Sequence, residues 1–477
     1  MRARTTITAL LGATLLLGVA SPGSAQVRPL PDDTLEYHYE GRKSVWMALG
    51  QVTAMNGLVW GFDYLVQRKE VFQISPKTFA TNLGRVPEWD TNTFGTNQLM
   101  HPYNGVMFYG AARAEGFSPL ASAAFTLVGS AQWEWLWETV NPSANDLYMT
   151  IMGGITLGES LGRLSAGIRQ NRSGGLVGIG QGLLAGLLDP GGSINRGVLG
   201  GTTPDEFLRP SIANRVLIGA STSPGLETQG ENRPATSAGA RGLFRLEIEY
   251  GDRFASRKQS FFDAFELDFQ FGGGTSGVGV DELRVRGVLF SGPRDRIGQG
   301  QSATYLDQEF EFSQNPAYSF GTQSFNASYR YRYVTRSGKW ELGARMDARA
   351  IPLAGVSSEH ANGELARRGI CSEPSGEIDR DYDYGSGVGA HLAGSVKRSG
   401  REVLKMSYGT SWVRTFSGAD GSHLVQEIRV RGTLPITRGW ALSAGWEMQT
   451  RDSQYDDLPA MSRTNSSFSL SASYGAF

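Results

Sequence analysis

The chain has 477 residues and a formal net charge of −1, with 45 basic and 46 acidic side chains. This balance gives no indication of a nucleic-acid partner. The mean hydropathy of −0.26 is too low for a bundle of membrane-spanning helices. It is compatible with a membrane β-barrel, in which only alternate residues face lipid. Cys371 is the only cysteine, so an intramolecular disulfide is excluded.

Residues 1–25 have the pattern of a secretory signal peptide. Arg2 and Arg4 provide the charged start, residues 7–20 are apolar, and Ala25 is a small residue at the expected cleavage point. The apolar stretch is shorter than the roughly 20 residues of a spanning helix. We therefore expect a cleaved, exported chain rather than an uncleaved anchor.

Residues 26–40 are predicted to be an N-terminal linker, and residues 41–170 a helical module of about four helices. Ser118 is a suitable N-cap for the third helix, with Pro119 at the next position. The module is rich in glycine and alanine, which allow helix backbones to approach closely. The helices are expected within residues 44–68, 97–116, 118–140 and 142–169.

Residues 171–211 are rich in glycine and weakly patterned, and we assign them to a linker that would allow one short amphipathic helix. From residue 212 onward the apolar residues recur at every second position, which predicts β-strands. Trp440, Leu442 and Trp446, for example, lie on the face opposite Glu447. We predict twelve strands, near residues 212–221, 242–251, 260–271, 279–290, 304–313, 324–334, 339–350, 384–397, 402–415, 424–434, 440–450 and 465–477.

The predicted turns are sorted by length between the two ends of such a sheet. The short turns TRSG, KRSGR and PITRG fall on one end, and the long connections 222–240, 351–383 and 451–464 on the other. Bacterial outer-membrane barrels have short periplasmic turns and longer outer loops. The sequence therefore predicts an α+β membrane protein, in which the helical module precedes an antiparallel transmembrane β-barrel of about 12 strands (residues 212–477).

Side chains predicted to face the barrel interior carry both signs of charge. They either pair across neighbouring strands and close the lumen, or line a water-filled pore. Pairing is favoured because porin lumens usually carry more of one sign. The set is Arg245, Glu247, Glu249, Glu266, Asp268, Glu282, Arg284, Arg286, Arg330, Arg332, Glu341, Arg345, Asp347 and Arg349.

Two resemblances add to this interpretation. The second half is similar to Gram-negative outer-membrane β-barrels, including a terminal aromatic residue, Phe477, although the alternation into it is not kept. The first half resembles the bacterial domain of unknown function 3943 over about residues 45–170. The matching segments are EWDTNTFGTNQLMHPYNGVMFYGAARAEGFS and GSAQWEWLWETVNPSANDLYMTIMGGITLGESLGRLS. This resemblance implies an envelope protein and no particular activity.

Polar residues within the predicted helices are the candidate site. Asn97 and His101 are four residues apart and share a helix face, as do Glu134 and Glu138, while Asp146 opens the fourth helix. In a compact module these side chains converge. His101, Glu134 and Glu138 are candidate metal ligands, since imidazole and carboxylate suit zinc, iron or manganese.

A second interpretation is acid–base chemistry on a lipid. His101 would act as base and a serine such as Ser118 or Ser130 as nucleophile, with Asn97, Glu134, Glu138 or Asp146 as orienting groups. No G-x-S-x-G motif supports this chemistry. The simpler alternative, a satisfied hydrogen-bond network between helices, is favoured. No catalytic residue, cofactor or metal is therefore predicted outright.

Three functions remain open from the sequence. The favoured one is a non-enzymatic channel or lipid-handling scaffold of the cell envelope. The others are a lipid-active enzyme around His101, Glu134 and Glu138, and a structural partner in envelope assembly. We expect the chain in the cell outer membrane with the helical module at the periplasmic side. Its expected partners are outer-membrane lipid and, during insertion, the barrel-assembly machinery.

Overall fold

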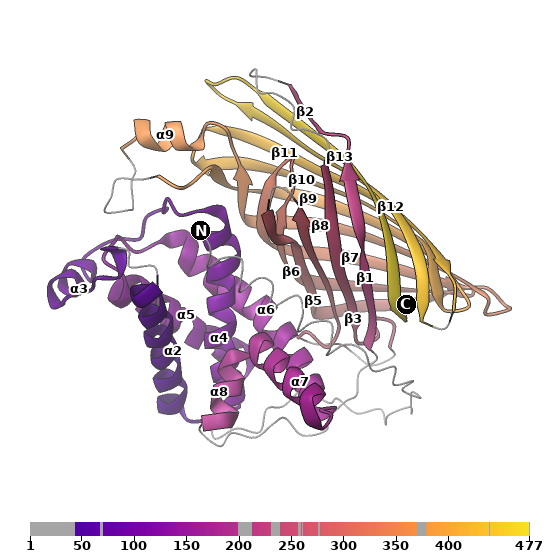
Figure 1. Ribbon diagram of the computed structural model, residues 1–477, viewed down its shortest axis with the longest axis horizontal. Coiled ribbons are helices and arrows are strands. Elements are labelled where there is room, and N and C mark those ends of the chain that lie inside the picture. The colour runs from indigo at the N-terminus through magenta and orange to yellow at the C-terminus, as the bar shows by residue number, and fades with distance from the viewer. Residues whose placement is uncertain are drawn as a thin grey trace. The chain divides into compact units, whose positions relative to one another are not determined.

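The structure is a computed structural model that describes residues 43–66, 70–198, 212–229, 239–255, 259, 261–274, 277–369, 378–437 and 439–476. The predicted signal peptide, the 26–40 linker, Cys371 and Phe477 lie outside these residues. The described residues fall into two units. The helical unit contains residues up to 209 together with 361–381, and the barrel unit contains the remaining residues from 210 onward (Figure 1).

The helical unit is built from α-helices interrupted by short segments of other helical type. The α-helices are α2 (Val45–Val66), α3 (Pro76–Asn82), α4 (His101–Ala114), α5 (Pro119–Gln132), α6 (Ala144–Gln170), α7 (Gly175–Leu188), α8 (Pro190–Val198) and α9 (Ala361–Arg367). The segment η1 (Glu70–Phe72) is a 3-10 helix, and η2 (Thr96–Met100) and η3 (Trp133–Trp137) are π-helical. Among the described helices, none has the length and hydropathy needed to cross a membrane.

The four predicted helices correspond to α2, η2 with α4, α5 with η3, and α6. Ser118 caps α5 as expected, accepting a hydrogen bond from the backbone N–H of Ala121. Within the predicted linker, which allowed one short helix, residues 175–198 form the two helices α7 and α8. Gly191 of α8 packs against α4 so closely that a Cβ there would lie 2.2 Å from the Met107 carbonyl oxygen.

Helices α4 and α6 form the centre of the unit and cross at glycines. A Cβ on Gly105 would lie 2.0 Å from the carbonyl oxygen of Thr150, and one on Gly154 would lie 2.8 Å from the backbone of Gly105. No side chain fits at either position. The small residues seen in the sequence therefore serve close backbone packing.

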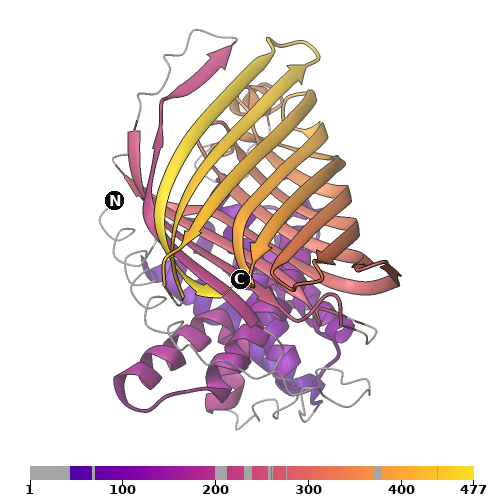
Figure 2. The same cartoon turned by 90° about the vertical axis from the view of Figure 1, so that its right-hand side faces the viewer.

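The barrel unit is one antiparallel sheet closed on itself (Figure 2). Its twelve long strands are β1 (Ile212–Ser223), β3 (Gly239–Tyr250), β4 (Phe265–Gly274), β5 (Gly277–Ile297), β6 (Gly300–Gln314), β7 (Ser319–Val334), β8 (Trp340–Ser357), β9 (Tyr382–Arg398), β10 (Arg401–Ser417), β11 (Gly421–Pro435), β12 (Trp440–Tyr455) and β13 (Met461–Ala476). A short strand, β2 (Leu226–Gln229), pairs with β13. β1 pairs with both β3 and β13, which closes the ring and confirms the predicted barrel.

The predicted sorting of turns is only partly seen. The turns before β8, β10 and β12 are short and lie at the end of the barrel that holds both barrel termini, called the terminus end below. The longest connection, residues 358–381, leaves the opposite end, called the loop end. However, residues 315–318 and 418–420 are short turns at the loop end, and residues 251–264 are a longer connection at the terminus end.

The contact of α4 with α6 yields a test of the helical unit. We expect Gly154→Val to lower the free energy of unfolding by about 1–3 kcal/mol or more, because the added methyl groups force the two helices apart. Gly167→Ala on the same helix is the matched control, since its Cβ meets nothing within 4 Å. The control should be neutral or stabilising by up to about 1 kcal/mol. Urea unfolding followed by helical circular dichroism measures both, and equal effects of the two changes would contradict this packing.

Candidate functional site

Three of the predicted site residues meet in the interior of the helical unit. His101 begins α4 directly after the π-helical η2, Glu134 lies in the π-helical η3, and Asp146 lies in the first turn of α6. Their side chains are buried, with exposed fractions of 7%, 1% and 2%. One ligand-type atom from each lies within 4.8 Å of the other two. Segments far apart in the sequence thus form one compact polar cluster.

Each carboxylate of the cluster is held through one of its oxygens. Glu134 Oε2 accepts a 2.7 Å hydrogen bond from the backbone N–H of Ser143. Asp146 Oδ1 accepts a 2.8 Å hydrogen bond from the side-chain amide of Asn145. Asp146 Oδ2 lies 3.5 Å from Nε2 of His101, and Glu134 Oε1 is buried without a hydrogen-bond partner. The held oxygens fix the orientation of the free ones.

Asp90 forms a second layer beside the cluster. Its Oδ1 accepts hydrogen bonds from the amides of Asn97 at 2.5 Å and Asn145 at 2.9 Å, and its Oδ2 accepts one from Asn92 at 2.6 Å. The guanidinium of Arg380 donates to the Asp90 carbonyl oxygen at 3.2 Å. Asn145 therefore links Asp90 to Asp146, so that the two carboxylates share one scaffold.

Burial and crowding of carboxylates shift the ionisation of these groups. Burial lowers the pKa of His101 to about 4, so its imidazole is neutral at physiological pH. Burial, and then the nearby Glu138, hold the pKa of Glu134 well above its ordinary value. Burial, followed by Asp90 and Glu134, has the same effect on the pKa of Asp146. The cluster has a neutral base and two carboxylates that lack a compensating charge.

The structure separates the remaining predicted residues from this group of three. Asn97 is bound to Asp90 rather than to His101. Glu138 ends η3 with an extended backbone, and its Oε1 accepts a hydrogen bond from the indole N–H of Trp133 at 2.9 Å. The residues that sequence reasoning missed are Asp90 and Ser143. Asp90 belongs to the segment EWDTNT, which has no helical period to draw attention to it.

A separate ion-pair network lies between α4 and α6. Arg113 donates to both carboxylate oxygens of Glu159, at 2.9 and 3.2 Å, and Arg163 pairs with Glu159 at 3.0 Å. Tyr109 donates to the same carboxylate at 2.9 Å. Glu159 and Arg163 are four residues apart on α6, which is the spacing of an ion pair on one helix face. Burial raises the pKa of Glu159, but the two arginines more than compensate and hold that pKa below its ordinary value.

Charged side chains also cross the barrel interior. Arg429 of β11 pairs with Glu282 of β5 at 2.7 Å, and Arg284 of β5 pairs with Glu427 of β11 at 3.3 Å. β5 and β11 lie at opposite positions of the ring. The inward charges therefore pair, but these pairs join opposite walls and not only the neighbouring strands for which pairing was predicted.

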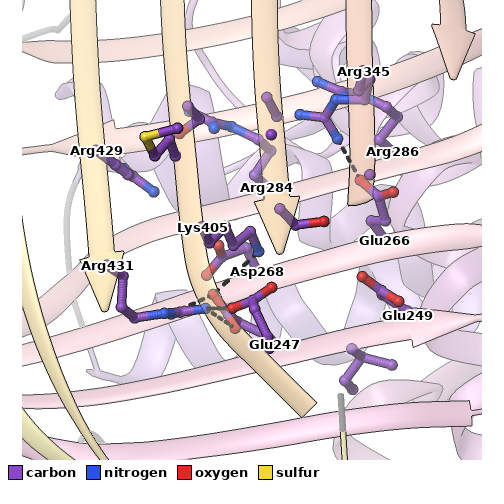
Figure 3. Close-up of a pocket in the computed structure, with 18 of the residues that line it drawn as sticks. Glu247, Glu249, Glu266, Asp268, Arg284, Arg286, Arg345, Lys405, Arg429 and Arg431 are labelled. Atoms are coloured by element: carbon purple, nitrogen blue, oxygen red, sulfur yellow. Dashed lines mark hydrogen bonds and ion pairs between the residues drawn. The ribbon is translucent and has the colours of Figure 1, made fainter. Parts of the chain in front are cut away.

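Further pairs on the terminus side border a chamber of about 320 Å³ (Figure 3). Arg431 reaches Glu247 at 2.7 Å and Arg345 reaches Glu266 at 2.7 Å, and both carboxylates come from other strands. Lys405 lies 3.5 Å from Glu247. The lining of the chamber is thus strongly charged, with both signs present.

Toward the loop end the interior contains an apolar cluster, beside buried ionisable side chains such as His423 and Asp383, which lie 3.1 Å apart. Tyr318 from the turn before β7 and Phe320 of β7 are buried there with side chains from β2, β8, β10 and β11. Because the outward side chains of the barrel are exposed, burial here means a position inside the lumen. The apolar layer consists of Leu226, Ala317, Tyr318, Phe320, Ile351, Ala354, Val356, Val413 and Val425.

Comparison with protein families places the polar cluster in a recognised domain. Residues 86–191 match the family described as Domain of unknown function (DUF3943), which confirms the resemblance predicted from the sequence. The match contains Asp90, His101, Glu134 and Asp146. It starts later than predicted and extends through α7. No curated protein matches the chain.

The barrel is similar to several solved structures at low identity. The NanC porin is 10% identical, with 54% of this chain and 98% of that chain covered and a TM-score of 0.24. The COG4313 outer membrane channel from Pseudomonas putida F1 is 13% identical, with 57% and 99% covered and a TM-score of 0.29. A likeness of this degree does not extend to function. The closed antiparallel ring, apolar outside and charged inside, is itself the architecture of outer-membrane β-barrels.

The Glu159 network yields a pH-dependent prediction. Glu159→Gln should destabilise the helical unit by about 3–5 kcal/mol at neutral pH, because Arg113 and Arg163 then lack their counter-charge. Since the folded-state pKa of Glu159 is depressed, its contribution is complete above the unfolded-state value of 4.5 and is lost as the pH falls below it. The difference from wild type should therefore shrink in acid.

Unfolding curves of both proteins at several pH values measure this difference. Glu364→Gln is the control, since Glu364 pairs with Arg367, whose side chain is largely exposed. Such a surface pair contributes at most about 1 kcal/mol. A Glu159→Gln difference that does not depend on pH would contradict the assignment of a charged Glu159.

Proposed function

We propose that the chain is an outer-membrane protein whose barrel is closed at rest and holds the helical unit at the membrane surface. The observation that carries this proposal is the pairing of β5 with β11 across the lumen through Arg429–Glu282 and Arg284–Glu427. An open pore requires water between these walls. Direct ion pairs at 2.7 and 3.3 Å place side chains across the lumen and narrow the path for water at this level.

The outward face of the barrel supports insertion into lipid. Leu342, Met346, Leu392, Met406 and Leu470 are all exposed on this face. An extended exposed apolar surface of this kind marks contact with lipid or another protein.

Aromatic side chains mark the terminus end of this apolar face. Trp340 and Trp440 begin β8 and β12 directly after the short turns, and Trp440 packs on Tyr474 with ring centroids 5.0 Å apart. Barrels carry such aromatic girdles where lipid meets water. The apolar face and its aromatic girdle are thus suited to contact with lipid. We propose that the barrel-assembly machinery inserts the barrel in this orientation.

Two layers of different chemistry support a closed state. The ion pairs form one layer, and the apolar layer around Tyr318 and Phe320 forms another toward the loop end. A rearrangement that breaks only one layer leaves the other in place. A gated channel is the second candidate function, favoured by the charged chamber on the terminus side, but it would require both layers to move.

The helical unit has its own affinity for a membrane surface in this proposal. Helix α7 exposes Leu176, Val177, Ile179 and Leu183, with Leu176 86% exposed, while Leu184 and Ala185 are buried on its other side. An exposed apolar face of this size is typical of contact with lipid or protein. We place it on the periplasmic leaflet, because the unit precedes a barrel with an even number of long strands.

The burial of the polar cluster argues against the lipid-active enzyme. His101 is only 7% exposed, so a lipid ester cannot reach its imidazole without opening of the helical unit. Ser118 is engaged as the cap of α5 and Ser130 is buried on the same helix. Neither serine is presented as an accessible nucleophile.

The closed lumen is tested by conductance in planar bilayers. We expect the wild-type protein to give no steady current. Serine substitutions of Arg284 and Arg429 alone, or of Tyr318 and Phe320 alone, should also stay closed, because one layer remains. The fourfold variant should conduct, since lumen substitutions in barrels change permeation without unfolding the wall.

Arg414→Ser is the matched control, because this arginine is half exposed and pairs with Asp456 outside the lumen. Heat-modified electrophoretic migration verifies that every variant is a folded barrel. A steady wild-type current would overturn the closed barrel and favour the channel.

The periplasmic placement is tested by labelling a single cysteine. Lys77→Cys, at an exposed position of α3, is made in a Cys371→Ser background and treated with a membrane-impermeant maleimide. We expect labelling only after the outer membrane is permeabilised. Labelling in intact cells would place the helical unit outside and contradict the proposal.

A further inference from the structure

The geometry of the polar cluster points to a binding site for one divalent transition-metal ion, and we infer that His101 Nε2, Glu134 Oε1 and Asp146 Oδ2 are its ligands. This inference is independent of the closed barrel, since all three residues belong to the helical unit. It assigns a resident cation to the domain that matches residues 86–191.

The ligand atoms are those that the protein itself leaves free. Glu134 uses Oε2 for the backbone N–H of Ser143, and its Oε1 is buried without a hydrogen-bond partner. Asp146 uses Oδ1 for the amide of Asn145, and its Oδ2 faces His101 at 3.5 Å. A buried carboxylate oxygen without a partner is costly, so its presence calls for a cation or a proton.

The distances suit a metal ion after small side-chain rotations. One ligand-type atom from each of the three residues lies within 4.8 Å of the other two, and Asp146 Oδ2 lies 3.5 Å from His101 Nε2. A central point therefore lies about 2.8 Å or less from such atoms, against roughly 2.0–2.2 Å in zinc–nitrogen and zinc–oxygen bonds. Three protein ligands leave at least one position for water, as in metal sites that are not fully closed.

The charges around the cluster favour a cation. Asp90 and Glu138 add to the negative field that acts on Asp146. Within the part of the chain that the structure describes, neither Glu134 nor Asp146 forms an ion pair with lysine or arginine. The neighbouring Glu159 carboxylate, by contrast, has two arginines. The site therefore lacks a protein counter-charge that an adjacent site possesses.

Residues next to the three proposed ligands hold the ligand side chains in place. Asn145 and Ser143 orient the two carboxylates, and Asp90 fixes Asn145 through a 2.9 Å hydrogen bond and a backbone N–H donated at 3.1 Å. Such outer partners are usual where ligands must be held for a metal. His101 and Glu134 also adjoin or occupy π-helical turns, which occur frequently at functional sites.

The donor set selects the class of metal. One imidazole nitrogen with two carboxylate oxygens suits zinc, manganese or iron, whereas calcium and magnesium prefer oxygen donors only. We therefore expect Zn²⁺ and Mn²⁺ to bind and Ca²⁺ to bind far more weakly.

The test uses the full-length protein in detergent after chelator treatment, with Cys371→Ser in every sample. Zn²⁺ titration by calorimetry, with metal analysis of the desalted complex, should give one ion per chain. His101→Gln, Glu134→Gln and Asp146→Asn should each weaken Zn²⁺ binding by roughly tenfold or more. Glu364→Gln is the control, because Glu364 forms a surface pair with Arg367 outside the cluster, and this change should alter affinity by less than about twofold.

A second measurement uses the wild-type chain alone, so it remains valid if the variants do not fold. Co²⁺ bound to the wild-type chain should give weak visible absorption bands of nitrogen and oxygen coordination, and Zn²⁺ should raise the Tm of the helical transition. Wild-type protein that binds neither Zn²⁺ nor Mn²⁺ would overturn the inference and leave a protonated carboxyl cluster. Equal weakening by Glu364→Gln and Glu134→Gln would also overturn it.

Discussion

Closure of the sheet through β1 and β13 is the constraint on which the barrel depends. The pairing runs from Asn214 with Ala476 to Thr222 with Phe468, so the ring has no free edge along this seam. A backbone in lipid must satisfy its hydrogen bonds internally, and a closed ring of strands achieves this. Once the ring exists, alternate side chains must face either lipid or a shared interior. The exposed leucines and methionines of one face and the arginines and carboxylates of the other are both consequences of that division.

Buried charges are neutralised by opposite charges inside the barrel, but only some of them are neutralised in this way inside the helical unit. Inside the barrel, arginines meet carboxylates from distant strands, so that each sign is balanced locally. In the helical unit, Glu159 is balanced by two arginines, but Glu134 and Asp146 meet only the neutral His101. Within one domain, the Glu159 network is therefore a neutralised structural network, whereas the cluster of His101, Glu134 and Asp146 lacks a counter-charge. This difference is the reason that the cluster, and not the Glu159 network, carries the functional inference.

The sequence predicted the barrel well because alternation is a strong signal in strands with one apolar face. All twelve long strands were located, but several extend further at the loop end, such as β12, which continues to Tyr455. There the lumen side chains no longer contrast with the outward ones, so the period fades. Only one short helix was predicted as possible where the structure has α7 and α8, because glycine disfavours helix formation. At Gly191 the same absence of a side chain permits contact with α4, which only tertiary packing reveals.

The sequence identified most of the residues that form the site, but it did not predict how they are arranged. Spacing by four residues places two side chains on one face of an α-helix, which suggested Glu134 together with Glu138. The π-helical η3 and the extended backbone at Glu138 break that relation, whereas Asp146, from another helix, comes close. Asp90 lies in a segment without period and could not be recognised from spacing.

The ion pairs across the lumen have a consequence for the order of assembly. Their partners are 147 residues apart for Arg429 and Glu282, 184 for Arg431 and Glu247, and 202 for Arg245 and Glu447. No hairpin or half-inserted sheet contains both members of any of these pairs. Contacts of such sequence separation form late and slowly. During biogenesis the charges must therefore remain hydrated until the final strands arrive, and drying of the lumen coincides with the last step of folding.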